Sequence, residues 1–250
     1  MVSSFNDIRK ISETDFRDSI KRTWRAIVPV GSLEQHGAHL PVSTDSLIAE
    51  YIATVIAEKI PSFVLPVISY GVSYEHMPMF NLSLRNSTLS SVLHDLCISL
   101  VENGIKHILL LNSHHGNVGV LQYIAQSLYG KVPGRTGIYT INYWHLMQRD
   151  FDHAGEVETS LVLAIAPDLV RMDRAQPNLK KLSKSKVAYS SITNNPGSFM
   201  NITGNGVWGD PRYATAQKGR MLIEEIVKNL SQTIVELENN NALDSNTVDQ

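Results

Sequence analysis

The side chains best suited to chemistry in this sequence stand in three short clusters. The first contains Glu34, His36 and Asp45, and it directly follows the apolar run 26–30. A carboxylate and an imidazole two residues apart, at the end of a strand, face the same way. Side chains of these types bind divalent cations. The first cluster therefore predicts a metal site, and a cation bound in this manner favours catalysis.

Two further clusters have the same character. Residues 112–117 follow the apolar run 106–112 and contain His114, while residues 152–158 contain His153 and Glu156 at the start of a helical pattern. Open α/β sheets form their sites at the carboxyl ends of the strands. We therefore expect the three segments to converge on one crevice.

Each of these residues, taken alone, also has an ordinary structural interpretation. Glu34 fits a solvated loop carboxylate, and Asp45 fits a helix cap or an acid in a first helical turn. His114 fits a hydrogen-bonded core histidine, and Glu156 fits another first-turn acid. Three such clusters at equivalent edges of one sheet together favour the metal site.

The elements that must position these residues follow from the hydrophobic pattern. Apolar runs predict strands at 25–30, 63–68, 106–112 and 137–141, and the second is weakened by Pro66. Helical patterns cover 44–55, 88–103, 118–129 and 156–166. A last helix is expected over 211–237, with Asp210 as its N-cap and Pro211 at its first position. This alternation predicts an α/β fold with a mostly parallel sheet covered by helices on both faces.

Size and composition indicate one ordinary globular domain. The chain has 250 residues, 43% hydrophobic and 18% charged, and we assign residues 1–238 to a single domain and 239–250 to a disordered tail. The polar segment 171–205 is interpreted as a long excursion within that domain. The net charge of −2 gives no reason to expect a nucleic-acid or membrane partner.

Cysteine content and the N-terminal sequence bear on location. The single cysteine, Cys97, excludes a disulfide scaffold and favours a reducing compartment. The first residues lack the pattern of a signal peptide, and no apolar run approaches the roughly 20 residues of a membrane span. We therefore expect a cytoplasmic protein.

Four segments of the chain together resemble the signatures of the creatininase (creatinine amidohydrolase) family. The segments are 29–45, 112–117, 153–160 and 206–219, and they occur in the family's order. The resemblance implies a three-layer α/β/α sandwich and a homo-oligomer, often a hexamer. It also implies two divalent metal ions per subunit, zinc first and otherwise manganese or iron. The implied activity is hydrolysis of an amide, formamide or cyclic amide C–N bond in a small-molecule substrate.

The resemblance also assigns roles to single residues. Asp45 would bridge the two metals, Glu34 and His114 would complete one site, and His36 and Glu156 would complete the other. Creatininase itself has a Glu two residues after its counterpart of His114, where this chain has Gly116, and an apolar residue in place of Glu156. The ligand would then have moved between segments, which places this chain with the wider family rather than with creatininase proper.

The remaining site residues are assigned on the same basis. His153 is the expected proton shuttle to the leaving nitrogen, and Asp152 is expected to orient it or to receive a proton. The expected substrate-binding residues lie in the second and third clusters and in the loops beside them: His76, His115, Asn117, Trp144 and Arg149.

Other functions remain open from the sequence. Within the family, they are deformylation of a formamidopyrimidine nucleotide and a peptidase step in the maturation of a peptide-derived cofactor. Outside it, a dinuclear phosphoesterase would need basic residues near the metals, for which Arg85, Arg149 and Lys184 are candidates. The last alternative is a non-catalytic binding protein with the same fold.

Overall fold

Four parallel strands form the central sheet in this computed structural model, which describes residues 7–180 and 195–244, with 240–244 described by their backbone alone. The strands are β1 (Arg25–Val30), β2 (Phe63–Val64), β3 (His107–Asn112) and β4 (Gly137–Asn142), in the order β2-β1-β3-β4. β1 and β3 are buried almost throughout, as strands covered on both faces should be. Of the predicted strands only the second differs, because β2 ends before Pro66 and the chain then touches β1 through a single bridge from Ile68 to Val30.

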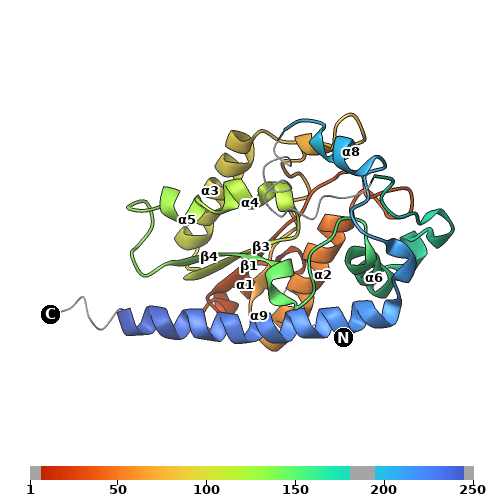
Figure 1. Ribbon diagram of the computed structural model, residues 1–250. Helices are drawn as coiled ribbons and strands as arrows, with labels where there is room; N and C mark the ends of the chain where they lie inside the picture. The colour runs from red at the N-terminus through yellow and green to blue at the C-terminus, as the bar shows by residue number, and fades with distance from the viewer. Residues whose placement is uncertain (1–6, 181–194, 245–250) are drawn as a thin grey trace.

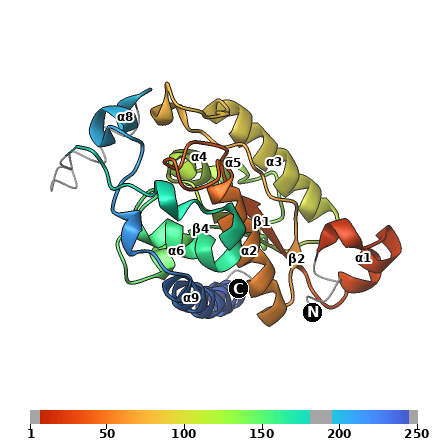
Figure 2. The ribbon, with the colours of Figure 1, turned by 90° about the vertical axis from the view of Figure 1, so that its right-hand side faces the viewer.

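Helices cover both faces of the sheet, as Figures 1 and 2 show. One layer contains α2 (Thr44–Lys59), α6 (Glu156–Ile165) and α9 (Ala216–Asp244), and the other contains α3 (Asn86–Glu102), α4 (Val118–Leu121) and α5 (Ile124–Ser127). Side chains of β1 alternate between the two resulting cores, with Ile27 in the first and Ala26 and Val28 in the second. The predicted three-layer α/β/α architecture is therefore confirmed.

Shorter helices complete the described chain. Two α-helices that the hydrophobic pattern did not predict are α1 (Glu13–Ser19) and α8 (Ser198–Thr203). The 3-10 helices are η1 (Ile8–Lys10), η2 (Tyr74–His76), η3 (His115–Asn117), η4 (Tyr143–Leu146), η5 (Pro167–Leu169), η6 (Met172–Arg174) and η7 (Pro211–Tyr213). No helix in the described residues is long and apolar enough to cross a membrane.

The last helix differs from its prediction at both ends. Asp210 caps the 3-10 helix η7, where its side chain accepts the Arg212 N–H at 3.1 Å, and α9 itself begins at Ala216. Its apolar stripe packs on α2 and α6, and the helix continues to Asp244, beyond the expected boundary at 238. An ion pair between Glu238 and Arg25 of β1 fastens this end of α9 to the sheet. Of the expected tail, residues 245–250 lie outside the described residues.

The excursion at 171–205 is described only at its two ends, since residues 181–194 lie outside the described residues. Those ends meet where the N–H groups of Leu179 and Lys180 donate to the carbonyl of Thr203, at 3.0 and 3.1 Å. Within the excursion, α8 packs against η2, so α8 lies beside the loop that carries His76.

Candidate metal centre

The first and second predicted clusters meet at the carboxyl ends of β1 and β3. Glu34 and His36 follow β1, Asp45 lies in the first turn of α2, and His114 follows β3. All four side chains are buried. The Ser113 hydroxyl donates to the Asp45 carbonyl at 2.7 Å and so ties the end of β3 to the start of α2.

Two further loops close over these residues. His76 lies in η2, in the loop 71–86, and the N–H of Gln35 donates to the Phe80 carbonyl of that loop at 2.8 Å. His153 precedes α6, and reciprocal backbone hydrogen bonds with Trp208, of 3.1 and 2.7 Å, hold it in place. The predicted convergence of three segments is thus observed, and the loop 71–86 adds a fourth.

The imidazole and carboxylate groups approach one another closely. His36 Nε2 lies 3.3 Å from Asp45 Oδ1 and 3.6 Å from Glu158 Oε2. His114 Nδ1 lies 3.2 Å from Asp45 Oδ2 and 3.3 Å from Glu34 Oε2. Asp45 therefore turns one oxygen toward each of two histidines, as a bridging carboxylate would.

Backbone carbonyls fix which ring nitrogen each histidine presents. His36 Nδ1 donates to the Glu34 carbonyl at 3.1 Å, His114 Nε2 to the Val72 carbonyl at 2.8 Å, and His153 Nε2 to the Gln35 carbonyl at 3.1 Å. A carbonyl only accepts, so these nitrogens carry the proton in the neutral ring. The other nitrogen of each ring then turns its lone pair into the space between the carboxylates, which is how metal-binding histidines are typically oriented.

Four buried polar atoms of the cluster have no hydrogen-bond partner: Glu34 Oε1, His36 Nε2, Asp45 Oδ2 and Glu158 Oε1. Burying a polar atom without a partner costs roughly 1–3 kcal/mol. Three overlapping sets of potential ligands meet here, namely Glu34, Asp45 and His114, then His36, His153 and Glu158, and then Glu34, His76 and His153. Divalent cations would satisfy the unpaired atoms and balance the three buried carboxylates, so the residues fit a metal centre.

The protonation of the cluster reflects the same crowding of charge. Burial alone would lower the pKa of His36, but the Asp45 and Glu158 carboxylates raise it to about 10. Burial alone would raise the pKa of Glu34, but His114 and His76 hold it well below its usual range. Protons therefore balance the carboxylates when no cation is bound, and a cation has to displace them.

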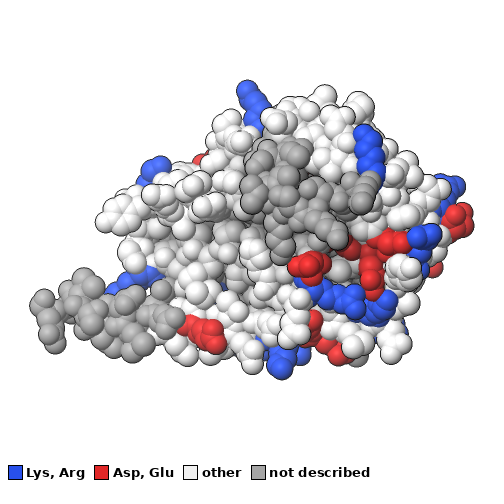
Figure 3. Space-filling view, in the orientation of Figure 1, with Lys and Arg blue, Asp and Glu red and all other residues white. Residues whose placement is uncertain are grey.

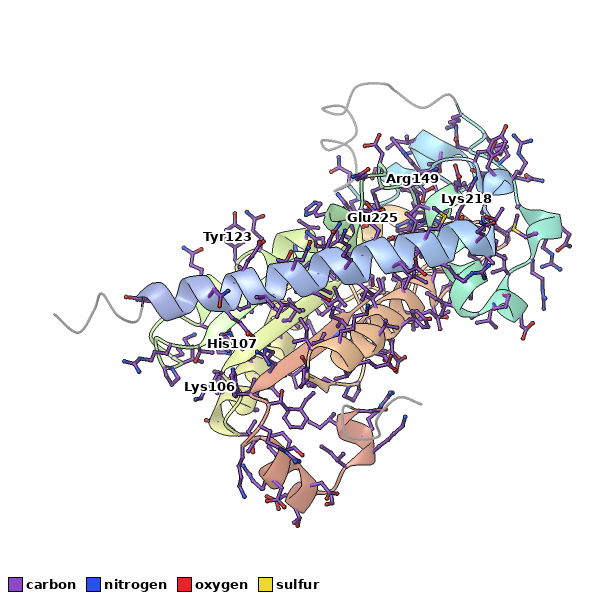
Figure 4. The ribbon with its side chains drawn as sticks, turned by 90° about the horizontal axis from the view of Figure 1, so that it is seen from below. Lys106, His107, Tyr123, Arg149, Lys218 and Glu225 are labelled. Atoms are coloured by element: carbon purple, nitrogen blue, oxygen red, sulfur yellow. The ribbon has the colours of Figure 1, made fainter. Side chains whose placement is uncertain are left out.

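Glu156, predicted as a ligand, lies outside this cluster. Its Oε1 atom is 2.6 Å from Lys218 Nζ and 3.1 Å from Arg149 Nη1. Arg149 and Lys218 lie near the start of α9 in Figure 4, and Figure 3 shows basic and acidic side chains gathered at that end of the molecule. The partners of Glu156 are thus surface cations, because the first turn of α6 points it outward.

Glu158 takes the place expected for Glu156. It is buried, and its Oε2 atom accepts the Ala154 N–H at 2.6 Å. Ala154 has a φ of 51°, in the left-handed region that a non-glycine residue rarely adopts. The tight turn before α6 therefore holds Glu158 toward the cluster. Its position on the buried face of α6, three and four residues before Leu161 and Val162, was the available sequence signal.

Gly116 occupies a position where no side chain fits. A Cβ atom there would collide with the Val72 carbonyl and would lie 2.7 Å from Glu75 Oε1. The loop 71–86 therefore fills the space beside His114 with Glu75, a residue that the sequence analysis did not select.

Only some of the predicted substrate-binding residues line the cavity beside the cluster. This small cavity, of about 20 Å³, is lined by Glu34, Asp45, Glu75, His76, His114, His115, Phe151, His153, Glu158 and Phe199. His76 and His115 are thus present, and Trp144 lies behind them, against Phe151 and His115. Asn117 is a scaffold residue instead, since its amide bonds to the backbone at Val72 and Gly31. Arg149 is exposed and pairs with Glu156.

Asp152, predicted as a catalytic residue, faces the backbone of α6. Its carboxylate accepts the N–H groups of Val157 at 2.8 Å and of Glu158 at 3.2 Å. Burial raises the pKa of Asp152 to about 7, although these two hydrogen bonds oppose the shift. The geometry is that of a helix cap beside the cluster.

Comparisons with known proteins agree with the signatures found in the sequence. The sequence model of the creatininase family, described as creatinine amidohydrolase, matches residues 9–234. The mycofactocin precursor peptide peptidase of Mycolicibacterium smegmatis is 32% identical over 222 residues, covering 83% of each chain. The creatinine amidohydrolase of Pseudomonas putida is 25% identical over 237 residues, covering 84% of this chain and 88% of the relative.

The fold also matches solved structures. A crystal structure of creatinine amidohydrolase superposes with a TM-score of 0.78, covering 92% of this chain and 97% of the other, at 23% identity. At that identity the likeness concerns the fold, and it agrees with the three-layer architecture described above.

Proposed function

Since this chain belongs to the creatininase family of C–N hydrolases, we propose that it is a metal-dependent amidohydrolase that acts on a small molecule in the cavity beside Glu34. The observation that supports this most strongly is the convergence of three buried carboxylates with three histidines whose free ring nitrogens face them. Such a ligand set suits hydrolytic chemistry.

The proposed centre holds two divalent ions. Glu34 and His114 would serve one ion, His36, His153 and Glu158 the other, and Asp45 would serve both. Bound ions of this kind would make a water more acidic and polarise the carbonyl of the substrate. Nitrogen and oxygen ligands together suit zinc, manganese or iron, of which we propose zinc. Creatininase has been solved in a manganese form and a zinc–zinc form.

His153 is better suited to metal binding than to the proton transfer expected from the sequence. Its Nε2 atom is committed to the Gln35 carbonyl, and its Nδ1 atom faces Glu34 Oε1 and Glu158 Oε2 at 3.9 and 4.0 Å. Neither nitrogen is left to carry a proton to a leaving group. We therefore assign His153 to the metal centre, and we assign Asp152 to the positioning of Glu158.

The lining of the cavity favours a neutral or cationic amide over a phosphate ester. Glu34, Asp45, Glu75 and Glu158 line it, and no Lys or Arg among the described residues does so. Phosphate recognition normally uses Arg or Lys, but Arg85 is exposed, Arg149 pairs with Glu156, and Lys184 lies outside the described residues. Phe151 and Phe199 supply apolar walls that would exclude water around a small planar substrate.

A peptide substrate is the second candidate. The mycofactocin precursor peptide peptidase shares 32% identity with this chain, against 25% for creatinine amidohydrolase. Both activities break an amide C–N bond, so the same cluster would serve either. A third possibility within the family is deformylation, because one relative is a deformylase of a formylaminopyrimidine nucleotide.

The test uses chelator-stripped protein refilled separately with zinc, manganese or iron(II). Each form is assayed with creatinine, formylated aminopyrimidines, short peptides and phosphomonoesters. We expect amide hydrolysis that depends on the added metal. Metal-dependent release of phosphate alone would support a phosphoesterase instead. A protein that binds no metal and hydrolyses none of these compounds would be better described as a binding protein.

We also propose a cytoplasmic homo-oligomer, with a hexamer as the expected assembly. The lone Cys97 is buried and free, which suits a reducing compartment. Exposed apolar side chains gather in one segment beside the site, at Tyr70, Tyr74, Met77, Phe80 and Leu82, and a self-contact would cover them. Light scattering on the full chain distinguishes a hexamer from a monomer.

A further inference from the structure

The Gln35 side chain has a fixed orientation at the centre of the site. Its Oε1 atom accepts the Gly37 N–H at 3.0 Å, and its Nε2 atom donates to the Gly206 carbonyl at 3.1 Å. Rotating the amide by half a turn would set donor against donor at Gly37 and acceptor against acceptor at Gly206. The backbone therefore identifies which end of the amide is the nitrogen.

This nitrogen also faces two histidines. Gln35 Nε2 lies 2.8 Å from His76 Nδ1 and 3.2 Å from His153 Nε2. One of its two N–H groups serves Gly206, so one remains. His153 Nε2 already carries a proton, because it faces the main-chain carbonyl of Gln35 at 3.1 Å. The remaining N–H must go to His76 Nδ1, which then accepts.

Gln35 thus contacts two rings that are both in the Nε2–H tautomer, His153 through its main-chain carbonyl and His76 through its side-chain amide. His153 has its proton on Nε2 and turns the lone pair of Nδ1 toward the carboxylates. His76 has its lone pair on Nδ1 and its proton on Nε2, which lies 3.0 Å from Glu34 Oε1. His76 and Glu34 both line the cavity, so a carbonyl oxygen that enters it would compete with Glu34 Oε1 for this N–H.

The surroundings of Gln35 leave it little freedom to move. Gly206 has a φ of 74°, and a Cβ atom there would collide with Gln35 Oε1. Phe199 packs against both histidine rings, with centroids 4.8 Å from each. Close packing of this kind keeps the donors and acceptors in register.

We propose that Gln35 is a positioning residue that holds His76 as a neutral N–H donor to the carbonyl oxygen of the substrate, and that leaves His153 as a metal ligand. The role in catalysis rests on the proposed amidohydrolase function. Water that has lost a proton to solvent adds to the carbonyl carbon as hydroxide. The new C–O bond forms as the π pair of the C=O bond moves onto the carbonyl oxygen, and the hydrogen bond from His76 to that oxygen strengthens. The proton of His76 stays on its ring, and nothing is oxidised or reduced in this step.

The direct test is the ¹⁵N spectrum of protein labelled only in its histidine rings. It is recorded on the chelator-stripped protein and on the zinc-refilled protein, and His76→Asn identifies the signals of that ring. We expect a neutral His76 ring with its proton on Nε2 in both forms. A proton on Nδ1 of His76 in the wild-type protein would overturn the proposal without need of any further variant.

Gln35→Glu then tests the positioning role, and the same change at exposed Gln126 is the matched control. In this variant a carboxyl oxygen replaces Nε2 of Gln35. If that oxygen carries a proton, the proton goes to the Gly206 carbonyl, and the oxygen can only accept from His76. The proton of His76 should therefore move to Nδ1. We expect bound zinc to be unchanged and kcat to fall about 10²-fold or more, the usual loss when one such donor is removed. An unchanged His76 signal in Gln35→Glu would contradict the proposal.

The tautomer and the function can fail separately. If zinc-loaded wild-type protein hydrolyses no amide while His76 carries its proton on Nε2, the proposed function and the substrate contact of His76 are both lost. The control of the tautomer by Gln35 would still stand, because it is measured without turnover.

Discussion

Glu158 Oε2 lies 3.6 Å from His36 Nε2, and this contact joins the third ligand segment to the first. The two residues come from the start of α6 and from the loop after β1. Glu156, only two residues earlier, turns to the surface and pairs with Lys218 at 2.6 Å. Which of these two glutamates belongs to the metal centre therefore depends on the direction in which the first turn of α6 points each side chain.

Glu158→Gln should lose metal while Glu156→Gln should retain it. The first change removes a buried anionic oxygen from the cluster, and the second removes a partly exposed ion pair worth about 1 kcal/mol or less. Elemental analysis after zinc refilling measures the difference. Full metal content in Glu158→Gln would remove Glu158 from the centre, and loss of metal in Glu156→Gln would return Glu156 to it.

His153→Asn should lower the amount of metal bound as well as turnover, because the Nδ1 lone pair faces Glu34 and Glu158. A proton shuttle would behave otherwise, with metal retained and the rate reduced about 10²–10⁴-fold. Zinc affinity and kcat, measured on the same preparation, separate these roles. Full zinc binding with lost turnover would restore the proton-transfer role of His153.

The metal-free protein should lose stability as the pH rises. The pKa of His36 is raised from 6.5 to about 10 by Asp45 and Glu158, despite the opposing effect of burial. A group whose pKa is higher in the folded than in the unfolded protein stabilises the fold fully at a pH below its unfolded-state pKa. This contribution decreases as the pH rises towards its folded-state pKa. The melting temperature of chelator-treated protein should therefore fall between about pH 7 and pH 10.

The zinc-loaded protein supplies the control for this pH series. There the cation replaces the proton of His36, so the same interval should show a smaller change in melting temperature. Parallel curves for the two forms would mean that His36 is not the group responsible.

Asp152→Ala should destabilise the protein and weaken metal binding. The substitution removes the acceptor for two N–H groups at the start of α6, and losses of helix caps cost about 1 kcal/mol. Because one of them belongs to Glu158, zinc affinity should fall by about 10–100-fold, as for other residues that orient ligands. Exposed Asp150→Ala is the control for thermal unfolding and zinc titration. Unaltered zinc affinity in Asp152→Ala would limit Asp152 to a structural cap.

The sequence predicts the strands and their common edge well, because the first two clusters each follow an apolar run that indicates a buried strand. The same rule places Glu34, His36 and His114 together from the sequence alone. The position of Asp45 in the first turn of a helix was predicted from the helical pattern that begins at residue 44. These residues depend on local pattern and on one property of parallel sheets, so a single sequence is enough to find them.

Residues that depend on tertiary contacts were harder to predict. The choice between Glu156 and Glu158 turns on the left-handed Ala154, and its one sequence signal is the spacing of Glu158 from the buried face of α6. The position of His76 depends on hydrogen bonds between the loop 71–86 and residues 33–35, and that loop has no regular hydrophobic period. Asn117 and Asp152 have the residue types of a site, but their hydrogen bonds go to the backbone.

The central claim is that the buried carboxylates and histidines hold two divalent ions. It is tested most directly by counting zinc per chain after chelator-stripped protein is refilled and freed of excess metal. We predict two zinc ions per chain, and a melting temperature that rises on refilling because the ions bind only the folded state. A count of one zinc ion or none would contradict the dinuclear centre.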